Sequence, residues 1–210
     1  MSNLSELTTI GTHQIYCTVS TGAKVNVTSS KTITITYSPY TATNLITNGS
    51  FESTIYDSTN IKSSTDYSVF GSKSLKAIGK NYNYIDITDI STPINHIFYV
   101  TGYTYVKSLS SGGYAMQEIY STCNSDYNLP SWHYFSITNG WQRNSSIGTS
   151  TCAISFFRIG LWNNSVTDVA YFDNFMIIDL TATFGSGNEP DKDWCDKHIT
   201  FFDGTTIIYK

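Results

Sequence analysis

Hydrophobic and polar residues alternate along much of this chain with a period of two, the spacing that predicts β-strands with one face toward a core. The first such run covers residues 11–37 and indicates two or three strands. About 40 residues cannot close a sandwich, so these strands must pack on the main domain, pair with another chain or stay partly ordered. The alternating positions are Ile15, Cys17, Val19, Val25, Val27, Ile33, Ile35 and Tyr37.

The segment SPYTATN, residues 38–44, ends this run with Pro39 and small polar residues, which indicates a linker. Short strand patterns then return about every ten residues as far as about residue 180, separated by turn signals such as SGG and TNG. This spacing is typical of an antiparallel sandwich or jelly roll. We therefore expect an all-β fold, an antiparallel β-sandwich with an N-terminal β-hairpin extension and one short C-terminal helix.

The last segment, residues 183–210, has a different pattern. Its loop FGSGNEP places glycines before a helix, but it lacks the Gly-Lys-Ser/Thr ending of a phosphate-binding loop, and the acids that follow would repel phosphate. Pro190 suits the first helical position, and a strand from Thr206 to Tyr209 follows a DGT turn. The acids near the helix start are Glu189, Asp191 and Asp193, and its apolar residues are Trp194, Cys195 and Ile199.

Charge and hydropathy exclude several partners. The formal net charge is -4 and the 12 basic residues are scattered singly, so nucleic acid is not an expected partner. No apolar window is long enough to span a bilayer, so we expect no membrane insertion, and the first residues lack the basic and apolar regions of a signal peptide. The composition, with 40% hydrophobic residues, suits a globular core.

The four cysteines are far apart in the sequence, with no CxxC spacing and no histidine pair nearby, so a metal or redox motif has little support. Buried free thiols are the expectation, and three disulfide pairings stay open if the protein matures in an oxidising compartment. The cysteines are Cys17, Cys123, Cys152 and Cys195.

Four stretches, taken in order, resemble carbohydrate-binding modules of the galactose-binding-like jelly-roll type. They are NLITNGSFES at 44–53, FGSKSLKA at 70–77, GWQRNSS at 140–146 and AYFDNFMIIDL at 170–180. The resemblance covers about residues 44 to 180 and implies that Trp141 packs in the core. It also implies a non-catalytic module whose partner is a polysaccharide.

Two other segments carry resemblances of their own. GTHQIYCTVS and KTITITYSP are similar to the last two strands of a bacterial immunoglobulin-like repeat, and residues 178–205 resemble a C-terminal signature of phage tail and tail-fibre proteins. We therefore expect partial immunoglobulin-like strands or an assembly extension at 1–40, a jelly roll at 41–182, and a turn, helix and strand packed on it at 183–210. The resemblance implies a virion tail or extracellular particle, made in the host cytoplasm without a signal peptide, and the chain is expected to be the C-terminal part of a longer tail protein.

The carbohydrate-binding resemblance also implies a structural calcium ion that ties the first strand of the jelly roll to the last. Matched residue by residue, Glu52 and Asp173 are the expected side-chain ligands, and Ser50 and Lys73 are the expected backbone-oxygen ligands. Calcium takes roughly six to eight oxygens and needs no contiguous loop when strands bring carboxylates together. The alternative is that Glu52 and Asp173 only accept hydrogen bonds from turn amides.

Sugar binding needs aromatic faces for the pyranose ring and a few amides or carboxylates for its hydroxyls. Alternation in WHYFSIT places Trp132 and Tyr134 on one face of the strand and Phe135 and Ile137 on the other. Phe135 and Ile137 are predicted to face the core, which leaves Trp132 and Tyr134 facing outward. The alternative for each candidate is packing against loops or the N-terminal strands. The expected ligand face consists of Tyr82, Tyr84, Asp86, Gln117, Glu118, Tyr120, Trp132 and Tyr134, with Trp162 contacting the ligand from a loop at the rim.

The sequence contains no recognisable catalytic motif. Glycoside hydrolysis needs two carboxylates in a cleft, and Asp86 and Glu118 could share a sheet face, but many pairs of acids meet this condition without being catalytic. We therefore expect a non-catalytic receptor-binding module for bacterial cell-surface or cell-wall polysaccharide. Several copies of a weak binding site in one assembly raise the overall affinity for a polysaccharide, so we expect a homo-oligomer. We also expect it to contact other tail proteins. The alternatives are a structural or interaction module without glycan binding, and a polysaccharide depolymerase domain.

Overall fold

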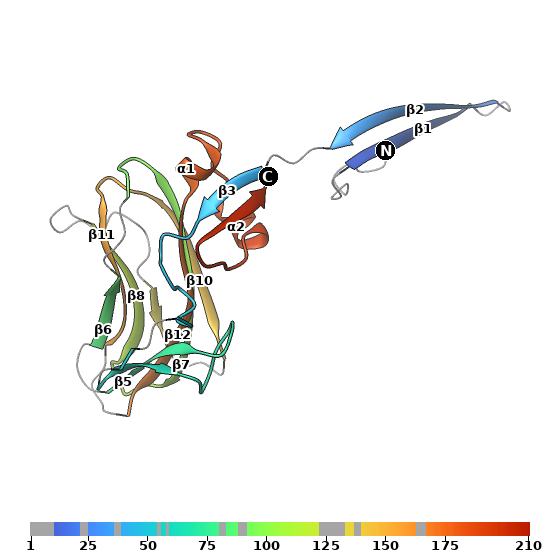
Figure 1. The fold of residues 1–210 in the computed structure, drawn as a ribbon. Helices are drawn as coiled ribbons and strands as arrows, with labels where there is room; N and C mark the ends of the chain where they lie inside the picture. The colour runs from blue at the N-terminus through green and yellow to red at the C-terminus, as the bar shows by residue number, and fades with distance from the viewer. Residues whose placement is uncertain are drawn as a thin grey trace. The chain divides into compact units, whose positions relative to one another are not determined.

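The computed structural model describes residues 11–21, 25–35, 39–53, 56–57, 59–79, 83–87, 92–121, 133–136, 140–162 and 167–210. The chain divides into two compact units. The first consists of residues 1–40 with 209–210, and the second consists of residues 41–208. Figure 1 shows the strands and helices of both.

The first unit contains a long antiparallel hairpin of β1 (Gly11–Thr21) and β2 (Val25–Ile35). Its register places the alternating apolar positions of both strands on one side of the hairpin, where Val19 lies opposite Val27 and Ile15 lies opposite Lys31. Residues 11–21 and 25–35 of the alternating run therefore form the predicted N-terminal β-hairpin extension. In this part of the chain the structure describes these two strands, which pair with each other as a two-stranded sheet.

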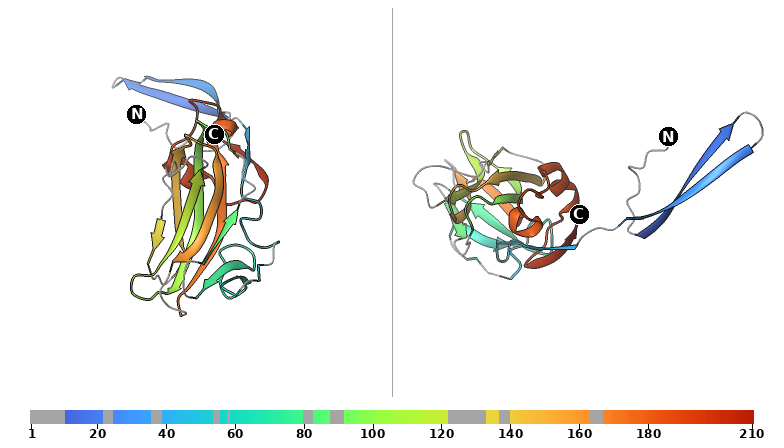
Figure 2. Two further views of the ribbon diagram at one scale, coloured as in Figure 1. Left: turned by 90° about the vertical axis from the view of Figure 1, so that its left-hand side faces the viewer. Right: turned by 90° about the horizontal axis from the view of Figure 1, so that it is seen from above.

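The second unit is a sandwich of two antiparallel sheets, which confirms the all-β prediction. The five-stranded sheet has the order β10-β7-β12-β5-β4, and the four-stranded sheet has the order β6-β11-β8-β9. The long strands β7, β10 and β12 run side by side in the turned view of Figure 2. The strand bounds are β4 (Ile61–Ser64), β5 (Ser74–Ile78), β6 (Asn83–Ile87), β7 (Ile97–Ser108), β8 (Tyr114–Ser121), β9 (His133–Phe135), β10 (Gln142–Thr149), β11 (Ile154–Trp162) and β12 (Val169–Asp179).

The core lies between the two sheets, where apolar side chains alternate along each strand. Val100 and Val106 of β7 and Phe172 of β12 face Ala115 of β8 and Phe135 of β9 in one buried cluster. The remaining fully buried aromatic residues of that cluster are Phe51, Phe98 and Phe175.

A bulge in β12 keeps this core continuous. The register against β7 shifts between Asp173 and Met176, and Asn174 adopts a φ of 54° there. One extra residue in the strand reverses the alternation after the bulge. Phe172 and Phe175, which an unbroken strand would place on opposite faces, therefore both reach the core cluster.

Residues 39–43 form a strand, so the linker prediction for this stretch is wrong. β3 (Pro39–Thr43) pairs with β13 (Thr205–Tyr209) as a two-stranded sheet. Pro39 suits the first residue of a strand because proline has no N–H for the ladder. The partner of β3 comes from the far end of the sequence, and no local pattern reports such a pairing.

The C-terminal segment contains the expected helix, α2 (Lys192–His198), preceded by a short helix α1 (Leu180–Phe184) that the sequence pattern did not single out. Asp191 caps α2 and accepts the Trp194 N–H at 2.8 Å, so Pro190 lies before the cap and not at the first helical position. Asp179 caps α1 in the same way. Figure 1 shows both helices at one end of the sandwich. No helix in the described part of the chain is long and apolar enough to cross a membrane.

Of the two cysteines whose side chains the structure describes, one is a free thiol and the other is in a disulfide bond. Cys195 is a free, fully buried thiol in α2, as expected. Cys152 is disulfide-bonded, so the expectation of free thiols is wrong for that residue. Cysteine spacing in the sequence is no guide to this difference, because a disulfide depends on which cysteines the fold brings together.

Candidate functional site

The predicted ligand face falls on the four-stranded sheet, and its centre is a residue that the sequence did not single out. Arg158 of β11 pairs in the register with Asp86 of β6 on one side and with Glu118 of β8 on the other. Nε of Arg158 donates to Oδ1 of Asp86 at 2.7 Å, and Nη2 donates to Oδ2 at 2.8 Å. This fork fixes both groups in one plane.

The ion pair is partly open to solvent. The side chains of Arg158 and Asp86 are 14% and 25% exposed, so the pair is neither a core salt bridge nor a free surface pair. The ring of Phe156 lies 5.0 Å from Cζ of Arg158, which is within the range of a cation–π contact. A guanidinium held from two directions is a fixed donor at the middle of the sheet.

Three of the predicted tyrosines occupy strand positions beside this pair. Tyr84 pairs with Gly160, Tyr120 pairs with Phe156, and Tyr134 pairs with Met116, which in turn pairs with Gly160. Strand positions two residues apart share a face, so these are positions on the Arg158 side of the sheet. Met116 is buried, so the face is covered at that position.

For several other predicted ligand residues the structure describes only the backbone or nothing, and one of them lies in a strand instead of a loop. Tyr82 and Trp132 lie outside the described residues, and so do the side chains of Tyr84, Glu118, Tyr120, Tyr134 and Trp162. The backbone of Trp162 ends β11, so this residue belongs to the strand and not to the loop that the sequence suggested.

Gln117 does not lie on the outer side of the sheet with Asp86 and Arg158, so its predicted position on that side is wrong. Its side chain is buried between the sheets, where Nε2 donates to Oγ1 of Thr104 at 2.9 Å. Thr104 lies on β7 of the five-stranded sheet, so this hydrogen bond joins the two layers. A buried amide needs a partner, and the inner threonine supplies it.

Trp141 lies outside the core that the resemblance implied. Its ring is half-buried and lies 6.0 Å from the ring of Tyr105. Tyr105 is on the outer face of β7, because its neighbours Thr104 and Val106 face the inside of the sandwich. Tyr67 and Tyr171 complete an aromatic cluster on this outer face, with ring centroids 4.9 Å apart.

The two predicted calcium ligands hold a loop in place through amide hydrogen bonds. Oε1 of Glu52 accepts the N–H groups of Ser72 and Lys73 at 2.9 and 2.6 Å. Desolvation opposes ionisation of Glu52, but these donors hold its pKa below the ordinary value. Gly71 lies so close that a Cβ there would stand 2.5 Å from Oε1.

Asp173 binds the other part of the same loop. Oδ2 accepts the N–H groups of Val69 and Phe70 at 2.7 and 3.3 Å, and Oδ1 accepts the N–H of Asn174 at 2.8 Å. Asp173 is fully buried, and this burial raises its pKa to about 6 despite the three donors.

The carboxylates of the two expected side-chain ligands therefore accept hydrogen bonds from backbone N–H groups. N–H donors, not further oxygens, converge on Glu52 and Asp173, while the ammonium of Lys73 donates to the Glu52 carbonyl and the hydroxyl of Ser50 donates to Asp203. Among the described residues no group of three or more histidine, cysteine or acidic side chains is placed to hold a metal ion. The contacts of Glu52 and Asp173 are those of the hydrogen-bonded alternative, and the calcium ion, which would also use the backbone oxygens of Ser50 and Lys73, stays a prediction of the resemblance.

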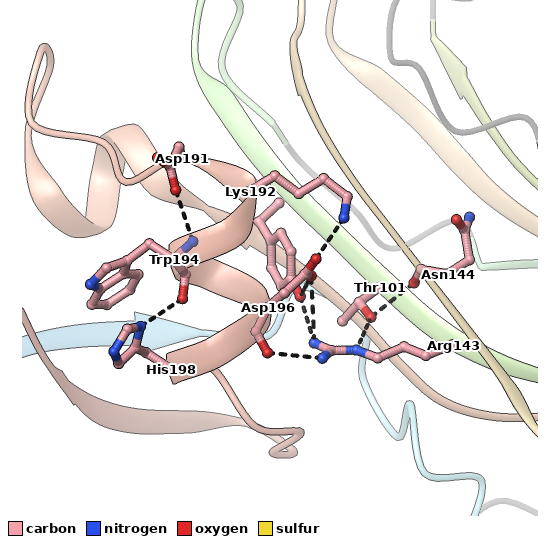
Figure 3. A network of polar contacts seen from close by, with 9 residues as sticks. Thr101, Arg143, Asn144, Asp191, Lys192, Trp194, Asp196 and His198 are labelled. Carbon is pink, nitrogen blue, oxygen red and sulfur yellow. Dashed lines mark hydrogen bonds and ion pairs between the residues drawn. The ribbon is translucent and has the colours of Figure 1, made fainter.

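A second polar cluster joins α2 to the outer face of the five-stranded sheet (Figure 3). The guanidinium of Arg143 donates through Nε to Oγ1 of Thr101 at 3.0 Å, through Nη2 to the hydroxyl of Tyr99 at 2.6 Å, and through Nη1 to the carbonyl of Asp196 at 3.1 Å. The hydroxyl of Tyr99 donates to Oδ1 of Asp196 at 2.8 Å. This network binds the C-terminal segment to β7 and β10.

No family model matches the chain, and no curated protein sequence matches it. Carbohydrate-binding modules are among the solved structures to which it is similar. A family 16 carbohydrate-binding module shares 18% identity over 64% of this chain and 99% of its own, with a TM-score of 0.49. The module TmCBM61, solved with β-1,4-galactotriose, shares 13% identity over 64% of this chain and 97% of its own, with a TM-score of 0.47.

A phage protein is also among these structures. The enzymatically active domain of tailspike protein 4 of bacteriophage CBA120 shares 12% identity over 64% of this chain and 21% of its own, with a TM-score of 0.47. TM-scores below 0.5 at identities below 20% establish no common ligand or activity. The all-β sandwich rests on the strand pairings of this chain.

Proposed function

We propose that this protein is a non-catalytic carbohydrate-binding module of a phage tail or related particle, and that it recognises glycans of bacterial cell surfaces. The observation that carries the proposal is the row of Asp86, Arg158 and Glu118 across three adjacent strands, with tyrosine positions on both sides. The sequence motifs that resemble those of carbohydrate-binding jelly rolls also support glycan binding.

The chemistry of this row suits sugar hydroxyls. A hydroxyl both donates and accepts, and the Arg158–Asp86 fork offers a fixed donor next to a fixed acceptor. Because the pair is already formed, it loses little side-chain freedom when a sugar binds. Tyrosines at the flanking positions would supply the flat apolar faces on which pyranose rings stack.

The same pair argues for binding and against hydrolysis. A glycosidase needs one carboxyl group as an acid and a second as a nucleophile or base across a cleft. Both oxygens of Asp86 accept hydrogen bonds from Arg158, which suits a fixed binding group. Arg158 also lies between Asp86 and Glu118 in the register, so a cation separates the two acids that the sequence offered as a catalytic pair.

Binding to an array of bacterial cell-wall and capsular polysaccharides tests this proposal. The Asp86→Asn variant keeps the shape of the side chain but removes the charge that orients Arg158, so we expect a loss of affinity of about ten-fold or more. A matched control is Asp66→Asn, which breaks the Lys76–Asp66 ion pair of 2.6 Å on the five-stranded sheet. If Asp86→Asn folds and binds like the wild type, the proposed site is wrong.

A release assay separates binding from cleavage. Incubation of the wild-type protein with every polysaccharide that it binds should liberate no reducing ends above background. Release that disappears in Asp86→Asn would establish the depolymerase alternative. Folding without binding to any polysaccharide would favour the structural or interaction alternative.

A further inference from the structure

A cavity of about 380 Å³ lies on the outer side of the five-stranded sheet, away from the proposed glycan face. Its walls come from separate parts of the sequence. Thr101 and Tyr103 belong to β7, Arg143 belongs to β10, and Asp196 and Phe201 belong to α2 and the chain after it. The C-terminal segment therefore builds this cavity together with the sheet.

One end of the cavity is a fixed hydrogen-bonding group. The guanidinium of Arg143 is held by Thr101, Tyr99 and the carbonyl of Asp196, as Figure 3 shows. Three contacts, two from β7 and one from α2, leave the guanidinium little freedom. A ligand that binds beside it meets a donor that is already oriented.

A buried acceptor without a partner lies in the same wall. Asn174, in the β12 bulge, is 4% exposed and lines the cavity. Its Oδ1 has no hydrogen-bond partner within the described part of the protein. A buried amide oxygen without a donor is unfavourable, so a donor supplied from the cavity would stabilise this arrangement.

The mouth of the cavity is aromatic. Phe70 is 57% exposed, and its ring centroid lies 5.9 Å from that of Phe201 at an interplanar angle of 54°. A large apolar ring at a polar cavity offers a face on which the C–H groups of a sugar ring can pack. Half-buried Tyr103 adds a second aromatic ring to the lining.

The charge of the lining selects among possible ligands. Arg143 and Asp196 are the two charged side chains of the described lining, and their charges cancel. A phosphate or another strong anion would need an excess of positive charge there. Aromatic faces, an amide oxygen and hydroxyls without net charge instead suit a neutral sugar, and the volume suits one or two sugar units.

We propose that this cavity is a second saccharide site, which binds a neutral pyranose of one or two units independently of the four-stranded sheet. This inference rests on the proposed function, because it assumes that the cavity and the four-stranded sheet both bind glycans. Two sites on opposite sheets would let one copy of the protein engage two segments of a polysaccharide, which raises the overall affinity.

Saturation-transfer NMR on the full chain tests this site, with methyl β-D-glucopyranoside, methyl β-D-galactopyranoside and the methyl β-glycoside of N-acetylglucosamine as probes at millimolar concentration. We expect at least one probe to bind. Phe70→Ala should weaken that binding about ten-fold through loss of the aromatic face, and Thr200→Val should weaken it through loss of a lining hydroxyl. Ile94→Ala, which removes an equally exposed apolar side chain outside the lining, should bind like the wild type.

The Asp86→Asn variant separates the two sites. Probe binding that is lost in Phe70→Ala and kept in Asp86→Asn supports the cavity. Probe binding that is lost in Asp86→Asn and kept in Phe70→Ala overturns the cavity and leaves the proposed function in place. If no probe binds the wild type while the polysaccharides do, the cavity proposal alone is wrong.

Discussion

Phe175 of β12 lies directly over Gly102 of β7. A Cβ on Gly102 would stand 2.4 Å from Cε1 of Phe175 and within 2.8 Å of two more ring atoms. The bulge that turns Phe175 inward therefore requires a glycine on the neighbouring strand. The alternation of the sequence reports neither the bulge nor the need for this glycine.

Gly102→Ala should destabilise the sandwich by about 1–3 kcal/mol, because the added methyl group must displace a fully buried ring. Urea unfolding followed by circular dichroism measures this loss. The control is Gly140→Ala, since a Cβ at Gly140 meets nothing within 4 Å. Equal midpoints for Gly102→Ala and the wild type would show that Phe175 is free to move away.

Stability should depend on pH through Asp173. Its pKa in the folded protein is about 6, above the ordinary value of 3.8, so the folded state binds this proton more tightly than the unfolded chain. Between about pH 4 and 6 this group therefore stabilises the protein as the pH falls, and the stabilisation is lost as the pH rises.

The measurement is urea unfolding at several pH values in the presence of a chelator, for the wild type and Asp173→Asn. The difference between their free energies of unfolding should change by on the order of 2 kcal/mol from about pH 4 to about pH 7. Subtracting the variant removes the contributions of the other acids. Parallel pH curves for the two proteins would contradict the raised pKa of Asp173.

Glu52 distinguishes the hydrogen-bonded loop from a calcium site. Glu52→Gln leaves one oxygen to serve the N–H groups of Ser72 and Lys73 and removes the charge that strengthens both bonds. On these contacts we expect its thermal unfolding temperature to fall by the same amount in calcium and in EGTA. A wild-type unfolding temperature that rises with calcium, but not in Glu52→Gln, would instead support the calcium prediction.

The strand pattern and the N-terminal hairpin were predictable because they depend on neighbouring residues. The strand at Pro39–Thr43 was not, since its partner Thr205–Tyr209 is far along the sequence and pairing between distant segments leaves no local signal. The short helix Leu180–Phe184 was missed for a related reason. Its cap, Asp179, is also the last residue of a buried strand, so the two patterns overlap there.

The candidate site also contains residues that the sequence predicts and residues that only the fold reveals. Asp86 and Glu118 were found as acids on one face of their strands, but Arg158 between them was not, because only the register shows that three strands align these charges. Gln117 was misplaced because a glutamine in a strand normally suggests an outer face. Its amide lies inside only because Thr104 of the opposite sheet accepts its hydrogen bond.

The N-terminal hairpin should mediate association through its apolar face. A two-stranded hairpin is marginally stable alone, and the register of β1 and β2 pairs Val19 with Val27. Val27→Lys places a charge on the apolar side, so light scattering should show a smaller particle for it than for the wild type. Thr28→Lys is the matched control, because adjacent strand residues point to opposite faces and the charge then lies on the polar side. A wild-type protein that is monomeric at every concentration, or two variants that dissociate equally, would rule out assembly through this face.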